Sequence, residues 1–159
     1  MKKPLQQVQK EYEDFINHLP DYINQLKSYF KTDTFHYGLS EIEQVEKFLK
    51  KHKKKSASLG LTPEQLDTMV VAYLGVAWLW HFGGQWFMVK HQSASEYGVP
   101  LLAGFGGKEY RGVAINPSGW VSMSRENQLD KPISAIYKNY IWFFENHPQY
   151  PLEPIRNIQ

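Results

Sequence analysis

The stretch that most constrains the fold runs from Thr62 to Trp86, TPEQLDTMVVAYLGVAWLWHFGGQW. Thr62 and Gln65 have the three-residue spacing of a capping box, which marks the first turn of a helix. No residue between Met69 and Phe82 is charged, and a helix that is apolar on nearly all sides has to be covered by other elements. Paired glycines then end the helix. The stretch therefore predicts a buried central helix followed by an aromatic strand.

Two further expectations follow from the length of this helix and from Gly75. Its uncharged run of 14 residues is shorter than the ~20 residues that span a bilayer, so we expect no membrane partner. A glycine inside a helix is less favourable than alanine by about 1 kcal/mol. We therefore expect another element to approach the helix closely at Gly75.

The composition bounds the class of protein. A chain of 159 residues with 42% hydrophobic and 15% aromatic residues is large enough to bury one core and should form one domain. Its net charge of +2 does not require a polyanionic partner. The absence of cysteine excludes disulfides, thiolate metal sites and cysteine nucleophiles, and it favours a reducing, cytoplasmic location.

The N-terminal third has a helical pattern. Over residues 5–29, apolar side chains recur at alternating intervals of three and four, which is a heptad seam. Pro20 interrupts the seam, since proline removes a helix hydrogen bond. We expect a helical hairpin or a kinked helix packed on its own domain, and the seam also allows a homodimer. The helices expected here are 4–18, 20–31 and 40–51.

The second half of the chain reads as strands and a final helix. Residues 85–90 are apolar on both faces, which suggests a central strand. Asn116-Pro117-Ser118-Gly119 has the residue order of a type I turn, and short turns between strands indicate an antiparallel sheet. Apolar residues at helical spacing between Asp130 and Pro148 predict the last helix. The expected strands are 85–90, 101–105, 109–115 and 120–123.

These patterns predict an α+β fold: an antiparallel sheet of about four strands packed against a buried central helix, with an N-terminal helical hairpin and a C-terminal helix. We expect a single domain over residues 1–159. Its expected parts are a helical N-terminal part (1–55), a helix-sheet-helix core (61–147) and an extended tail (148–159).

The motifs of known chemistry do not fit the chain. GFGGKE, residues 104–109, resembles a phosphate-binding loop, but Leu102 stands where such a loop needs glycine and Glu109 where it needs serine or threonine. No two of the six histidines have metal-ligand spacing, and no pair of carboxylates is placed for acid–base catalysis. We therefore predict no catalytic residue, no metal and no cofactor.

Two functions remain as alternatives to protein binding. In the first, a pocket between the central helix and the sheet would bind a small molecule or catalyse a reaction, and His81, His91 and Glu96 would line it. In the second, the basic run KKHKKK, residues 50–55, would contact nucleic-acid phosphates. We favour the simpler interpretation, that this run is the solvated end of a helix.

A resemblance is carried by AYLG at 72–75 and HFGGQW at 81–86, followed by a glycine-rich pair of strands and an aromatic helix. Over residues 62–145 this arrangement resembles small bacterial α+β proteins with such a helix-to-strand junction. Where they often have an acidic residue after the glycine, this chain has Val76. Several small cytoplasmic proteins of this build are immunity proteins, which neutralise antibacterial toxins.

The failed catalytic motifs and this resemblance together favour a non-enzymatic immunity protein whose partner is a cognate toxin. Tyrosine and arginine are preferred anchors at protein interfaces, and the loops of the second half contain both. The residues expected to bind the partner are His91, Glu96, Tyr97, Lys108, Tyr110 and Arg111.

Overall fold

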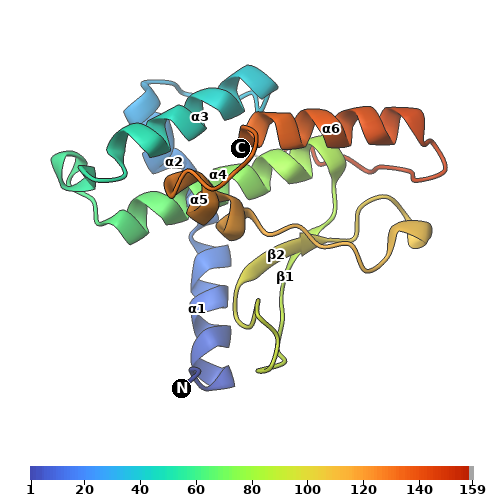
Figure 1. Ribbon diagram of the computed structural model, residues 1–159, viewed down its shortest axis with the longest axis horizontal. Coiled ribbons are helices and arrows are strands. Elements are labelled where there is room, and N and C mark those ends of the chain that lie inside the picture. Colours follow the sequence, from blue (N-terminus) through green and yellow to red (C-terminus); the bar gives the residue numbers. More distant parts are fainter. Residues whose placement is uncertain (158–159) are drawn as a thin grey trace.

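The computed structural model describes residues 1–157, which form a helical body with a small two-stranded sheet (Figure 1). The α-helices are α1 (Leu5–Asn17), α2 (Leu19–Phe30), α3 (Leu39–His52), α4 (Pro63–Phe82), α5 (Pro117–Arg125) and α6 (Ile133–Asn146). The strands are β1 (Gln85–Met88) and β2 (Pro100–Ala103), and two short 3-10 helices are η1 (Ser56–Leu59) and η2 (Lys108–Tyr110).

The buried central helix is confirmed as α4. The Thr62 side chain accepts a hydrogen bond from the Gln65 N–H at 3.1 Å, and the Gln65 side chain accepts one from the Thr62 N–H at 2.9 Å, which completes the capping box. The helix ends at Gly83, whose φ of 76° favours glycine. Every residue from Met69 to Leu79 is buried, because α2, α3 and α5 pack around α4.

The expectation of a four-stranded sheet is wrong. Within residues 1–157, β1 and β2 form a two-stranded antiparallel sheet in which Trp86 lies opposite Leu102. Residues 109–115 contain η2 and irregular chain, and only Ile115 makes a bridge to β2. The fold is therefore mostly helical with a small sheet, and β1 is not a central strand.

The segment expected as strand 120–123 lies inside α5. The Asn116 Oδ1 accepts a hydrogen bond from the Gly119 N–H at 3.0 Å, and Pro117 occupies the first turn of the helix. A type I turn and the first turn of a helix have similar backbone angles, so Asn-Pro-Ser-Gly fits both. The decisive signal is the helical spacing of the buried residues Pro117, Val121 and Ser124.

Helices α1 and α2 form a kinked helix, so the hairpin expectation is wrong and the kinked alternative is confirmed. The single residue His18 separates them, and its backbone still bonds to Asp14 and Tyr22. Pro20 lies in the first turn of α2, where a missing N–H is tolerated. In Figure 1, α1 projects away from the layer that contains α3, α4 and α6.

Most apolar residues of the heptad seam in α1 and α2 pack against other parts of the same chain. Val8, Phe15 and Leu26 are buried, whereas Leu5 is exposed. Phe15 packs edge-on against Trp86, with ring centroids 5.2 Å apart. The homodimer through residues 5–29 stays a prediction.

The close approach expected at Gly75 is confirmed, and the approaching group is the indole of Trp86. A Cβ atom placed on Gly75 would lie 2.0 Å from Trp86 Cζ2. The glycine therefore lets β1 dock onto α4 and fixes where the small sheet meets the helical body.

The segment after α6 has no regular secondary structure and packs across the C-terminal end of α4. The Ile155 N–H donates to the Leu79 carbonyl at 2.9 Å, and the Arg156 guanidinium lies 3.7 Å from the centre of the Trp80 ring. Tyr150 packs on Tyr110. Residues 148–157 thus cover the aromatic end of the core.

Candidate functional site

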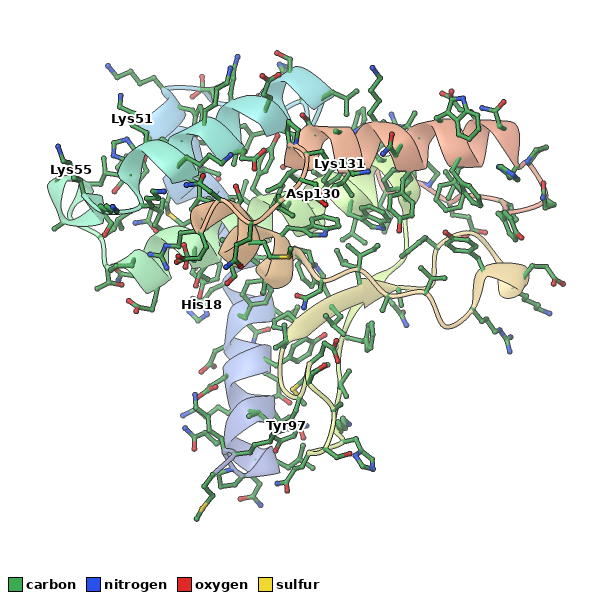
Figure 2. All side chains as sticks on the ribbon, in the orientation of Figure 1. His18, Lys51, Lys55, Tyr97, Asp130 and Lys131 are labelled. Carbon is green, nitrogen blue, oxygen red and sulfur yellow. The ribbon has the colours of Figure 1, made fainter. Side chains whose placement is uncertain are left out.

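The residues predicted to bind a partner lie in two separate groups. His91, Glu96 and Tyr97 belong to the loop between β1 and β2, and the Tyr97 hydroxyl donates to the Lys3 carbonyl at 2.9 Å. Figure 2 shows Tyr97 beside the N-terminal end of α1, whereas Lys108 and the other two residues of the second group lie at η2, on the far side of the sheet (Figure 1).

Within the second group, Tyr110 has a packing role. Its ring is partly buried and contacts Phe105, Phe144 and Tyr150 at centroid distances of 5.8, 5.2 and 5.1 Å. Lys108 and Arg111 are exposed beside it. The structure therefore does not combine the six predicted residues into one surface.

The alternative pocket is not formed, because the residues expected to line it do not converge. These residues are His81, His91 and Glu96. His81 Nε2 contacts the Tyr37 carbonyl at 2.6 Å, so Nε2 carries the proton and donates. His91 is exposed on the loop after β1, where its Nδ1 lies 2.7 Å from the Ser93 hydroxyl, and Glu96 is five residues further along the same loop. These contacts give His81 a structural role between α4 and the Tyr37 backbone.

Burial lowers the pKa of His81, although its hydrogen bond to Tyr37 opposes this and the nearby Arg156 adds to it. Because the folded pKa lies below the unfolded value of about 6.5, the unfolded chain binds more protons as the pH falls below that value. We expect stability to fall from about pH 6.5 downward, and less so in His81→Gln. Urea unfolding of both proteins across this range measures the difference; identical pH profiles would contradict it.

The lysine run 50–55 ends α3 and enters a turn. Lys50 lies 3.8 Å from the Glu46 carboxylate, and Lys53 donates to the Arg125 carbonyl at 3.3 Å. Lys51 and Lys55 are exposed at one end of the molecule (Figure 2). The run is therefore partly used to hold α3 and α5 together, and nucleic-acid binding through it stays a prediction.

A cleft that sequence reasoning missed lies where the kinked helix α1–α2, α4, α5 and the start of β2 meet. Its volume is about 540 Å³, within the range typical of ligand sites. The four segments are far apart in the chain, and no local motif connects them. The acidic residues that line this cleft are Glu11, Asp14, Glu64 and Asp67, and its aromatic residues are Tyr12, Phe15 and Tyr22.

Within residues 1–157, two of the four carboxylates in the cleft have a cationic partner. Glu11 pairs with Lys3 at 2.9 Å, and Asp67 Oδ2 pairs with the Arg125 guanidinium at 2.9 Å. Asp14 and Glu64 form no ion pair with any residue in the described range 1–157. The cleft therefore carries an excess of negative charge, although the whole chain is weakly basic.

Asp67 is partly buried, whereas the other three carboxylates are exposed. Its Oδ1 is buried and has no hydrogen-bond partner among the residues that the structure describes. Burial raises the pKa of Asp67, the Arg125 guanidinium opposes this, and the neighbouring Glu64 raises the pKa further.

The rest of the lining, called here the aromatic wall, is aromatic and aliphatic. Phe15 and Tyr22 stack with ring centroids 5.9 Å apart and planes 27° apart. Val71 of α4 and Val121 of α5 complete the apolar lining. Burial raises the pKa of Tyr22, and the charges of Asp14 and Asp21 raise it further. An occupant of this cleft would meet apolar surface and negative charge together.

The described residues contain no group of three or more histidine and acidic side chains placed to hold a metal ion. None of their helices combines the length and hydropathy that a membrane span requires. Comparison of the chain with family models, curated proteins and solved structures finds no match. The cleft between α1, α4 and α5 is therefore interpreted from its own geometry.

Proposed function

We propose that the protein is a non-enzymatic binding protein of the immunity type, which neutralises a toxin by direct contact, and that the partner docks over the cleft between α1, α4 and α5. The observation that carries the docking site is the coincidence of an open volume of about 540 Å³, a stacked aromatic wall and two carboxylates that have no ion pair among the described residues. Protein interfaces favour aromatic anchors beside polar groups that fix orientation.

The immunity role rests on the resemblance of residues 62–145 to toxin-neutralising proteins. It predicts that the toxin is encoded beside this protein. Co-expression with the product of the neighbouring gene should relieve its growth inhibition, and the two proteins should elute as one complex in size-exclusion chromatography. Unchanged growth inhibition together with separate elution would contradict the proposal.

A steric variant tests whether the cleft is the docking site. Ser122 is exposed on α5 and lines the cleft, so Ser122→Trp would fill part of it without a change in charge. We expect at least about tenfold weaker partner binding, since interface centres dominate affinity. The matched control is Met123→Trp, because Met123 is also exposed but lies outside the cleft lining. If Ser122→Trp and Met123→Trp bound the partner with equal affinity, the cleft would not be the docking site.

A further inference from the structure

We infer that the cleft between α1, α4 and α5 accepts an arginine side chain of the partner protein, with the guanidinium at Asp14 and Glu64 and the aliphatic stem against the aromatic wall. This inference rests on the proposed function, since it names the group by which the partner is recognised.

The charge of the cleft selects a cation. Lys3 and Arg125 neutralise two of its carboxylates, and Asp14 of α1 and Glu64 of α4 remain without an ion pair in the described chain. These two carboxylates come from different walls of the cleft, so one cation between them would be attracted by both. Both carboxylates are exposed, so this attraction should weaken as salt rises.

The apolar lining selects a long side chain with an apolar stem. Arginine and lysine both bury their methylene groups on apolar surface while the charged end contacts polar groups. Phe15 is buried, so the ring available to an occupant is that of Tyr22, which is partly exposed and stacks on Phe15. A planar guanidinium stacks on such a ring better than an ammonium group does. The chain itself contains such a contact, in which Arg156 lies over Trp80.

The number of acceptors also favours arginine. Arg125 donates to Asp67 Oδ2 at 2.9 Å, while Asp67 Oδ1 is buried and has no partner within residues 1–157. Asp67 is thus occupied on one side and closed on the other, and the free acceptors are the exposed carboxylates of Asp14 and Glu64. A guanidinium has five N–H donors in one plane, so a guanidinium from the partner could donate to both. The three donors of an ammonium group lie around a single nitrogen and reach fewer of these oxygens at once.

The test uses the full chain and a defined probe, the capped tripeptide acetyl-Ala-Arg-Ala-amide. Its neutral analogue has citrulline in place of arginine. Titration followed by amide chemical shifts should show saturable changes at Thr68, Val71 and Val121, which line the cleft. We expect the arginine peptide to bind at least about tenfold more tightly than the citrulline peptide, and to weaken as salt rises.

Charge-neutral variants identify the carboxylates that bind the guanidinium. Asp14→Asn combined with Glu64→Gln should weaken the arginine peptide at least about fivefold. The matched control is Asp33→Asn combined with Glu145→Gln, because both residues are exposed and lie outside the cleft lining. The amide spectrum of each variant also reports whether it is folded, so a folding defect is not confused with lost binding.

Three results would overturn the inference: equal binding of the citrulline peptide, shifts confined to residues outside the cleft, or tighter binding of spermidine, which would indicate a free polyamine site instead. A partner complex that is blocked by Ser122→Trp but unaffected by Asp14→Asn with Glu64→Gln would leave the proposed function intact and remove the arginine. If the arginine peptide bound in the cleft but no partner complex formed, the arginine site would stand and the proposed function would fall.

Discussion

Gly75→Ala is expected to lower the free energy of unfolding by about 3 kcal/mol, because an added methyl group has no room on α4. Its Cβ would lie 2.0 and 2.1 Å from Cζ2 and Cη2 of Trp86. The ring cannot simply rotate away, since Phe15 packs against it with centroids 5.2 Å apart. In a helix with free space at this position, the same change would stabilise the fold by about 1 kcal/mol. A loss of stability would therefore indicate the contact with Trp86. Urea unfolding monitored by circular dichroism measures it.

A second substitution tests whether the indole is the cause. Trp86→Leu in the Gly75→Ala background should recover part of the lost stability, giving a coupling energy of at least about 1 kcal/mol in a double-mutant cycle. The control is Gly38→Ala, because a Cβ at Gly38 meets no atom within 4 Å; it should change stability by less than about 1 kcal/mol. Equal effects of Gly38→Ala and Gly75→Ala, or strictly additive effects of Gly75→Ala and Trp86→Leu, would contradict this account.

The elements that sequence reasoning located correctly are those whose signals are local. The capping box at Thr62, the uncharged run and the stop at Gly83 all lie within α4 or directly beside it. The close approach at Gly75 could be expected from its position alone, because glycine inside a buried helix is unfavourable without such a reason. The identity of the approaching group, Trp86, needed the three-dimensional structure.

The elements that were predicted wrongly are those whose local signals fit two structures. Asn116-Pro117-Ser118-Gly119 fits a type I turn and the capped start of α5 equally well. In residues 109–115, Tyr110 and Val113 pack against the core from η2 and irregular chain, and the one sheet contact of this region is Ile115 with Leu102. The cleft could not be predicted at all, because its lining comes from four segments that only the fold brings together.

Glu46 shows how a buried charge can organise three elements, and its loss should be the second large effect. It lies on α3 and is only 4% exposed. Its Oε2 accepts a hydrogen bond from the Ser124 hydroxyl of α5, and its Oε1 accepts one from the Ile133 N–H at 2.8 Å. Ile133 begins α6, where the preceding Pro132 provides no side-chain cap. Glu46 therefore caps α6 from another helix, and the negative charge suits the N-terminal end of its dipole.

Glu46→Ala leaves two buried donors without an acceptor, each of which costs about 1–3 kcal/mol. We expect a loss of about 3 kcal/mol in the free energy of unfolding, with faster hydrogen exchange at the first turn of α6. Glu46→Gln keeps a carbonyl oxygen for the Ile133 N–H, so its loss should be about half as large. Glu43→Ala on the same helix is the control, since Glu43 is exposed and its contact with Lys47 contributes less than about 0.5 kcal/mol. If Glu46→Ala behaved like Glu43→Ala, the buried carboxylate would have no role in holding α3, α5 and α6 together.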